Sequence, residues 1–300
     1  MVEIRGLYKK YGSFSVLRGL NMNIENGDIY GFLGHNGCGK TTTMNIIADV
    51  IPKDEGTIKL GNGTEQIKVG YLPESPAIFP YMTAREYLEY IAACCKYHGD
   101  IPARVNEVLD IVGLTHAADR RSKGYSRGMT QRLGMGAAII NDPQLVIFDE
   151  PTSALDPQGR AEVVAIIRRL HEMGSTIVLS THILSDVEKV ANRIGIMNNG
   201  VLAEEGTLKE ILNKHGGNII MLEVLNLTDE AKIKLLSVDF ARAEFNNEIG
   251  LFRFGTDNPQ DCAARLIRLM SDNGIIPSSF RIGTATLDEV FQKVVAGYAG

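Results

Sequence analysis

Residues 34–41 of this 300-residue chain read GHNGCGKT and have the spacing G-x-x-x-x-G-K-[ST]. Glycines let the backbone turn so that successive N–H groups face one point, and the lysine after them adds positive charge there. An apolar segment, 29–33, precedes the loop and a helical pattern, 40–50, follows it, which is the context that a phosphate-binding loop requires. We therefore expect a nucleoside triphosphate here, with Lys40 at its β and γ phosphates and the Thr41 hydroxyl on Mg²⁺. The expected contacts are Gly34, His35, Asn36, Gly37, Cys38, Gly39, Lys40, Thr41 and Thr42.

Two acidic residues end another strongly apolar segment. Asp149 and Glu150 follow residues 145–148, and carboxylates at the carboxyl edge of such a strand lie beside a phosphate loop. We expect Asp149 to hold Mg²⁺ through water, and Glu150 to orient and deprotonate the water that attacks the γ-phosphate. His182 follows the apolar segment 176–180, so its ring can reach the same phosphate. The residues expected to carry catalysis are Lys40, Glu150 and His182.

Several further segments resemble the ATP-binding subunits of ABC transporters, and they occur in that family's order over residues 1–215. Residues 125–131, YSRGMTQ, resemble the family signature that is usually written LSGGQ. Residues 153–156, SALD, resemble its D-loop, and residues 180–182, STH, carry its switch histidine. The resemblance implies an ATPase with ATP and Mg²⁺ as its cofactors.

The resemblance also implies that two ATPase subunits, identical or different, close face to face around two ATP molecules. In such a dimer Ser126 and Gly128 of one subunit contact the nucleotide that the other subunit holds. The start of the helix expected there is an anion site on physical grounds as well, because its first N–H groups are free. The resemblance further implies nucleotide contacts at Tyr11, whose ring would stack on adenine, at Val16 and at Asp156.

Two positions depart from the family pattern. Arg127 stands where the signature has a glycine, and it adds positive charge near the partner's phosphate. Glu74, in the segment 71–74 (YLPE), stands where the family has the glutamine of its Q-loop. Because a carboxylate can also ligate Mg²⁺, we carry the metal-binding role over to Glu74.

The periodicity of the chain predicts an α/β fold. Residues 2–33 alternate apolar and polar side chains, which favours an antiparallel β-layer that leads into the loop strand. Residues 83–140 read as a helical block that interrupts the strands. Segments 145–148 and 176–180 flank a helical pattern at 159–173, which indicates a βαβ unit and a parallel sheet. With the resemblance, this is a P-loop NTPase core of the ABC type, with a mixed sheet, an antiparallel β-layer and a helical subdomain.

A glycine-rich turn at residues 61–63, GNG, lies between two strand-like segments, 57–60 and 66–71. Asparagine and glycine readily adopt the positive φ angles of tight hairpin turns. The sequence therefore predicts that these two segments pair as a hairpin.

The region 216–300 reads as a second domain, in the order strand, helix, strand, strand, helix, strand, helix. The first six elements fit a small α+β ferredoxin-like accessory domain, and residues 1–215 then form the ATPase domain. The segment 286–291, TLDEVF, resembles the tail of bacterial ABC ATPases linked to drug, bacteriocin, sodium or lipid export. On this resemblance we expect an exporter rather than an importer.

Composition narrows the possible partners. The net charge is −5, which argues against a dedicated nucleic-acid binder, and no apolar run approaches the roughly 20 residues that span a bilayer. We expect no signal peptide and a cytoplasmic protein that lies on the inner face of the cell membrane through a separate membrane-spanning permease. Residues 75–82 and the helical block are the expected contact with that permease. The alternative is a soluble ABC ATPase that acts on ribosomes or DNA, although such proteins usually carry two ATPase units or long coiled coils.

The four cysteines show neither metal-ligand spacing nor a disulfide framework. Cys94 and Cys95 lie in a helical pattern, and we expect them to be small core residues. Cys38 lies inside the phosphate loop, where Lys40 and the helix start favour its thiolate. Alkylation of Cys38 is therefore expected to block nucleotide binding.

Overall fold

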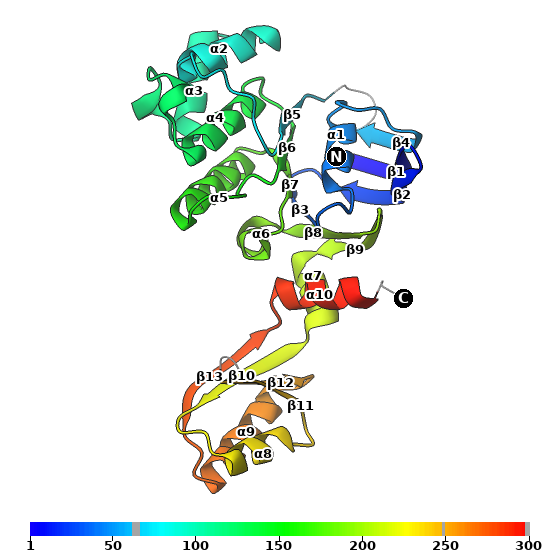
Figure 1. The fold of residues 1–300 in the computed structure, drawn as a ribbon, viewed down its shortest axis with the longest axis vertical. Helices are drawn as coiled ribbons and strands as arrows, with labels where there is room; N and C mark the ends of the chain where they lie inside the picture. The colour runs from blue at the N-terminus through cyan, green and yellow to red at the C-terminus, as the bar shows by residue number, and fades with distance from the viewer. Residues whose placement is uncertain (62–66, 248–249, 298–300) are drawn as a thin grey trace. The chain divides into compact units, whose positions relative to one another are not determined.

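The computed structural model describes residues 1–61, 67–247 and 250–297, and these form two compact units, Met1–Leu208 and Lys209–Gly297 (Figure 1). Among these residues no helix combines the length and the apolar character needed to cross a lipid bilayer.

The first unit is built on a six-stranded sheet of order β5-β6-β7-β3-β8-β9, in which β8 and β9 pair antiparallel and the other neighbours are parallel. The three strands β6, β7 and β3 are buried at every position, as expected of parallel strands with both faces covered. Their carboxyl ends lie at one edge, which brings Gly34, Asp149 and Ser180 together. The strands are β3 (Ile29–Gly34), β5 (Val69–Leu72), β6 (Leu145–Asp149), β7 (Thr176–Ser180), β8 (Arg193–Asn198) and β9 (Val201–Thr207).

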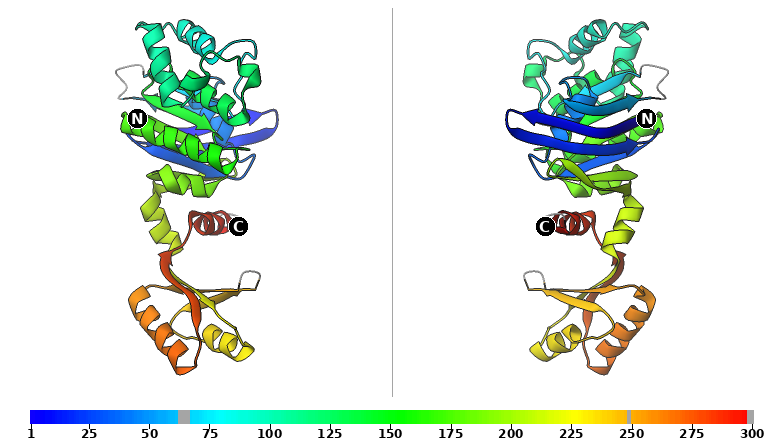
Figure 2. Two further views of the ribbon diagram at one scale, coloured as in Figure 1. Left: turned by 90° about the vertical axis from the view of Figure 1, so that its left-hand side faces the viewer. Right: turned by 90° about the vertical axis from the view of Figure 1, so that its right-hand side faces the viewer.

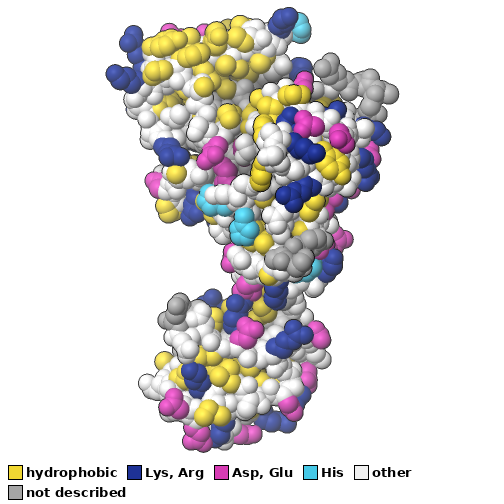
Figure 3. All heavy atoms as spheres, turned by 45° about the vertical axis from the view of Figure 1, so that its right-hand side comes forward, with side chains coloured by type: hydrophobic (Ala, Val, Ile, Leu, Met, Phe, Trp, Pro, Cys, Tyr) yellow, Lys and Arg dark blue, Asp and Glu magenta, His cyan; other side chains and the backbone are white. Residues whose placement is uncertain are grey.

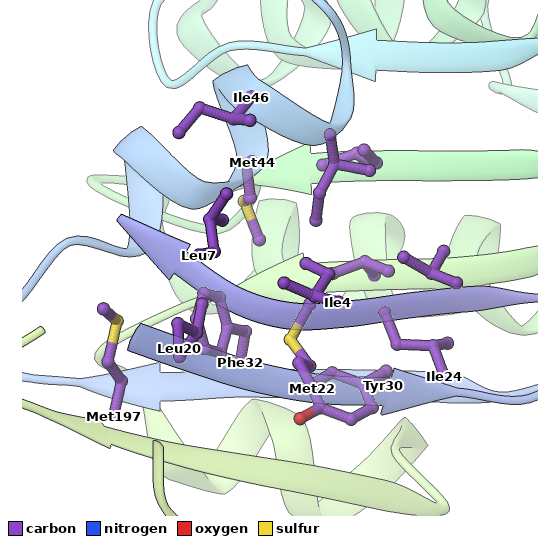
Figure 4. Close-up of a cluster of buried hydrophobic side chains, with 14 of the residues drawn as sticks. Ile4, Leu7, Leu20, Met22, Ile24, Tyr30, Phe32, Met44, Ile46 and Met197 are labelled. Carbon is purple, nitrogen blue, oxygen red and sulfur yellow. The ribbon is translucent and has the colours of Figure 1, made fainter. Parts of the chain in front are cut away.

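A three-stranded antiparallel sheet of order β2-β1-β4 faces one side of the larger sheet; its strands are β1 (Val2–Tyr11), β2 (Phe14–Ile24) and β4 (Glu55–Leu60) (Figure 2). Helix α1 (Lys40–Ile47) lies between the two sheets and adds Met44 to their shared core. The inward residues of β1 and β2, such as Ile4 and Leu20, pack there against Phe32 of β3 (Figure 4). This core fixes α1, and therefore the loop before it, against two layers of strands.

The predicted β-layer and βαβ unit are confirmed, but the predicted hairpin across residues 61–63 is wrong. Strand β4 belongs to the antiparallel sheet and β5 pairs in parallel with β6, so the two segments lie in different sheets. Residues 62–66 of the turn lie outside the described part of the chain. A local turn signal gives no information on whether a distant strand offers a better partner.

The predicted helical block contains α2 (Ala84–Cys94), α3 (Ile101–Ile111) and α4 (Arg127–Ile139), with short 3₁₀ turns at Thr115–Ala117 and Ser122–Gly124. Thr83 and Glu86 form a capping box at the start of α2, since each side chain bonds the backbone N–H of the other residue. At the far end of α4, the buried Arg104 donates to the carbonyls of Ile139 (2.7 Å) and Ile140 (3.1 Å). These bonds satisfy helix-end carbonyls and tie α3 to α4.

Helices α5 (Pro157–Glu172) and α6 (Leu184–Val190) follow β6 and β7, and α6 packs closely on β3. A Cβ atom at Gly31 would lie 2.6 Å from Cγ1 of Val187 in α6, so only glycine permits this approach. The close packing sets the position of the loop strand between its two neighbours.

The second unit begins with a helix, α7, that was not predicted, and after it the strands and helices follow the predicted order. Its strands form one antiparallel sheet of order β11-β12-β10-β13, and α8 and α9 pack on a core that includes Leu222, Phe252 and Leu266. Its elements are α7 (Leu208–Gly216), β10 (Asn218–Val224), α8 (Asp229–Leu236), β11 (Arg242–Asn246), β12 (Leu251–Thr256), α9 (Pro259–Asp272), β13 (Pro277–Thr284) and α10 (Leu287–Gly297).

Candidate functional site

The phosphate loop connects β3 to α1 through two glycines with positive φ angles, Gly37 (φ 79°) and Gly39 (φ 113°). A Cβ atom at Gly39 would lie 2.7 Å from Cε of Met197 and 2.8 Å from Cδ2 of Leu17. Position 39 therefore favours glycine for its backbone, and any larger residue would also have to displace the ends of these two side chains. At Gly37 a Cβ would meet nothing within 4 Å, so this part of the loop faces open space.

Lys40, the first residue of α1, is only 6% exposed. Its Nζ donates to the carbonyl oxygens of Gly34 (2.7 Å) and His35 (3.3 Å). The ammonium group is thus held across the loop, beside the free N–H groups of the helix start. Positive charge and inward N–H donors together make an anion site.

Asp149 ends β6 and is 1% exposed. Its Oδ1 accepts a hydrogen bond from the Ser180 hydroxyl at 2.5 Å. Its Oδ2 is buried and has no hydrogen-bond partner within the described residues. A buried carboxylate oxygen without a donor is destabilising unless a cation or water meets it, so this atom fits a hydrated metal ion.

Glu150 has an unusual positive φ of 50° for a residue with a side chain. Ser180 fixes this turn, because the Glu150 N–H donates to its Oγ (3.0 Å) and to its carbonyl (3.2 Å). The Glu150 carboxylate lies 2.8 Å from Nδ1 of His182, whose side chain is 54% exposed. The sequence did not single out Ser180, which contacts both acidic residues from one buried hydroxyl.

Lys40, Glu150 and His182 line one cavity of about 560 Å³, whereas Asp149 and Ser180 do not line it. It collects Lys40, Glu150, His182 and Glu74 beside the loop, so four side chains predicted from separate segments meet. Tyr11 does not line the cavity; the aromatic residue on its wall is Phe14, which pairs with Tyr11 across the same β1–β2 turn. The full lining is Phe14, Val16, Asn36, Gly37, Gly39, Lys40, Thr41, Thr42, Glu74, Glu150, Ser153 and His182.

A second cavity of about 420 Å³ contains the other predicted contacts, Ser126, Gly128 and Asp156. Ser126 caps α4, with its Oγ accepting from the Met129 N–H at 3.2 Å. The cap uses the Met129 N–H, whereas the N–H groups of Arg127 and Gly128 before it have no carbonyl acceptor within the helix, and a Cβ at Gly128 would meet nothing within 4 Å. Asp156 caps α5 by accepting from the Gly159 N–H at 2.7 Å. The two cavities share no lining residue.

The prediction that the loop favours a Cys38 thiolate is wrong. Cys38 is 8% exposed, and its burial raises the pKa of the thiol despite the opposing effect of Lys40. The prediction that Cys94 and Cys95 are core residues is also wrong, since both are exposed where α2 ends. Sequence spacing placed the pair on a helix without showing which side of the helix faces solvent.

The side-chain oxygens that line the first cavity are suitable ligands for a Mg²⁺ ion that is bound together with a phosphate chain. Within residues 1–61, 67–247 and 250–297, no three or more His, Cys, Asp or Glu side chains gather as a self-contained metal site. Mg²⁺ usually takes one or two carboxylates, water and substrate phosphates. Thr41 and Glu74 on the cavity wall, with the unpartnered oxygen of Asp149 nearby in the sheet edge, fit that kind of binding.

Comparisons with known proteins show which chains this one resembles. A family model described as "ABC transporter" matches residues 17–153. The bacitracin transport ATP-binding protein BcrA of Enterococcus faecalis is 34% identical over 99% of this chain and 97% of its own length. The linearmycin resistance ATP-binding protein LnrL of Bacillus subtilis (strain 168) is 33% identical over 79% of each chain.

A solved dimeric structure of an ATP-binding cassette in a post-hydrolysis state, bound to ADP and Pi, is 26% identical with a TM-score of 0.62. The similarity covers 69% of this chain and 99% of that one. The names of BcrA and LnrL describe transport and resistance, and neither name mentions ribosomes or DNA.

Proposed function

The chain belongs to the ABC transporter family of ATP-binding proteins, and on that basis we propose that it drives export through a separate membrane-spanning partner. It is an MgATP-hydrolysing subunit that works as a dimer. The observation that carries the proposal is the meeting of Lys40, Glu74, Glu150 and His182 in one cavity at the phosphate loop. The direction of transport is supported by relatives named for antibiotic resistance and bacitracin transport.

The roles that we propose for the residues follow from their contacts. Lys40 neutralises charge on the β and γ phosphates, while the loop N–H groups bind their oxygens. Glu150 accepts a proton from the attacking water, and His182 orients the Glu150 carboxylate and reaches the γ-phosphate. Thr41, Glu74 and Asp149 would hold Mg²⁺, which offsets phosphate charge when bound. The remaining nucleotide contacts in this proposal are Tyr11, Val16, Gly34, His35, Asn36, Gly37, Cys38, Gly39 and Thr42.

The second cavity supplies the reason for a dimer. Ser126 and Gly128 form an anion-binding start of α4, with Asp156 at the start of α5 on the same cavity wall, and none of the three lines the cavity of the phosphate loop in its own chain. In a symmetric pair, each copy presents this end to the nucleotide of the other. We propose that ATP closes the pair and that hydrolysis reopens it.

An exposed aromatic group, made by Phe79 and Tyr81 before the helical block and Tyr90 in α2, is the proposed contact with the membrane partner. Phe79 stacks on Tyr81 (ring centroids 5.7 Å apart) and meets Tyr90 edge-on at 5.7 Å. Tyr81 is 63% exposed and Tyr90 is 44% exposed, and hydrophobic side chains gather over this block at the top of Figure 3. Large exposed apolar groups of this kind favour a protein contact.

We propose residues 1–215 as the ATPase domain and 216–300 as an accessory domain, with the whole chain on the cytoplasmic face of the membrane. The compact unit that ends at Leu208 supports a boundary near this position.

A capture experiment tests the proposal. The Glu150→Gln variant, which keeps ATP bound because general-base catalysis is lost, is used to capture partners from detergent-solubilised membranes of its source with MgATP. Recovery of a multi-span membrane protein supports the proposal, and its loss in Tyr81→Ala/Tyr90→Ala locates the contact. Met173→Ala, at another exposed apolar position, is the matched control. Recovery of ribosomal or DNA-repair proteins in place of a membrane protein would overturn the proposal.

A further inference from the structure

Arg127 is a cation without an acidic partner in the second cavity. Arg132, which also lines this cavity, is paired with Glu162 at 3.4 Å. The Asp156 carboxylate is engaged by the N–H of Gly159. Arg127 itself is exposed at the start of α4, and no ion pair or hydrogen bond of its side chain occurs within the described ranges.

Glu74 is the matching acid in the first cavity. It is exposed on the cavity wall, and its carboxylate has no ion pair or hydrogen bond to any residue that the structure describes. Asp149 and Glu150 are already held by Ser180 and His182. Glu74, Asp149 and Glu150 therefore lie near the Lys40 ammonium, and bound MgATP adds further net negative charge, because its phosphates carry more charge than Mg²⁺ offsets.

These two charges line different cavities of one copy, and within the described residues no ion pair joins them. We propose, resting on the dimeric function above, that Arg127 of one copy faces Glu74 of the other across the bound nucleotide. Each site between the two copies then contains Glu74 of one copy and Arg127 of the other. Glu74, where the family has glutamine, adds one negative charge to that site, and Arg127, where the family has glycine, adds one positive charge. The two departures from the family pattern thus compensate each other, and Arg127 acts as a positioning residue for dimer closure.

A double-mutant cycle on ATP-driven dimerisation tests this pairing. The parent is Glu150→Gln, and dimer dissociation constants are measured by analytical ultracentrifugation with MgATP. Arg127→Gln is expected to weaken the dimer at least about tenfold, because it leaves Glu74 next to phosphate without compensation. With Mg²⁺ at a saturating concentration throughout, adding Glu74→Gln is expected to restore the dimer to within about threefold of the parent. Arg127→Lys, which keeps the charge, is expected to stay close to the parent.

Lys123→Gln removes a neighbouring exposed cation that does not line the cavity, and it controls for net charge. If Arg127→Gln weakens the dimer equally with and without Glu74→Gln, Arg127 acts on the phosphate alone and the pairing is overturned. If Lys123→Gln matches Arg127→Gln, the effect is one of general charge and the pairing is again overturned. A parent that stays monomeric with MgATP would overturn the dimeric function itself, which separates that failure from this one.

Discussion

Replacing Ser180 with alanine removes one hydroxyl that holds both acidic residues of the site. The Ser180 Oγ is fully buried, donates to Asp149 Oδ1 at 2.5 Å and accepts from the Glu150 N–H at 3.0 Å. The bond to the carboxylate is worth about 1.5–3 kcal/mol and the bond to the neutral amide about 0.5–1.5 kcal/mol. We therefore expect Ser180→Ala to lower the free energy of unfolding by about 2–4 kcal/mol.

The same change is expected to slow hydrolysis more than it weakens binding. Lys40 and the loop N–H groups remain in place, whereas the Glu150 turn at φ 50° loses one of its two bonds to Ser180. Misplacing a catalytic group by about 1 Å can cost roughly 100-fold in rate, so we expect kcat to fall by about 10- to 100-fold with a smaller change in KM.

Urea unfolding followed by circular dichroism measures the first effect, and steady-state ATPase kinetics measure the second. Ser185→Ala, an exposed serine five residues further along the chain, is the control and is expected to leave both quantities unchanged. A Ser180→Ala protein with unfolding free energy within about 0.5 kcal/mol of the parent and kcat within about twofold would refute the role given to this hydroxyl.

Three further predictions concern single residues around the loop. Lys40→Met keeps an apolar stem of similar length in a buried position but removes the ammonium group, so MgATP binding measured by calorimetry should weaken about 100-fold; unchanged affinity would contradict its phosphate role. Burial raises the pKa of the Cys38 thiol, so little thiolate forms at neutral pH, and iodoacetamide should label Cys38 more slowly than the exposed Cys94. The rate of Cys38 labelling should rise as the pH increases through and beyond the usual range of thiol pKa values. If mass spectrometry finds Cys38 labelled before Cys94 at pH 7, the burial of Cys38 is contradicted. Glu74→Gln should retain ATPase activity but require more Mg²⁺ for half-maximal rate, because a carboxylate ligand is lost, whereas complete loss of hydrolysis would show an essential role.

Much of the site could be predicted from the sequence because its residues lie at fixed places in local motifs. The glycine-rich loop before Lys40 comes directly after β3, and the two acidic residues lie where β6 ends. Both strands end at the same edge of the sheet. The capping box at Thr83 likewise depends only on residues three positions apart. Such signals are short in range and therefore visible in one sequence.

The features that were not predicted depend on contacts between distant segments. Strand β5 pairs with β6, which is distant in the sequence, rather than with its neighbour β4. The Ser180 hydroxyl reaches Asp149 because β7 pairs with β6, and this pairing of distant segments cannot be read from the residues around Ser180. The burial of Cys38 results from the packing of the antiparallel sheet over the loop, which its neighbours in sequence do not reveal.

Mixing two inactive variants tests most directly whether each site is shared between two copies. Glu150→Gln lacks the proposed base, and Ser126→Arg blocks the α4 end that contacts the other copy's nucleotide. A mixed dimer has one site in which both residues are intact, so an equimolar mixture should recover about a quarter of the parent ATPase activity, since half of the dimers are mixed and each has one working site. A mixture no more active than the average of the two separate variants would contradict a site built from two copies.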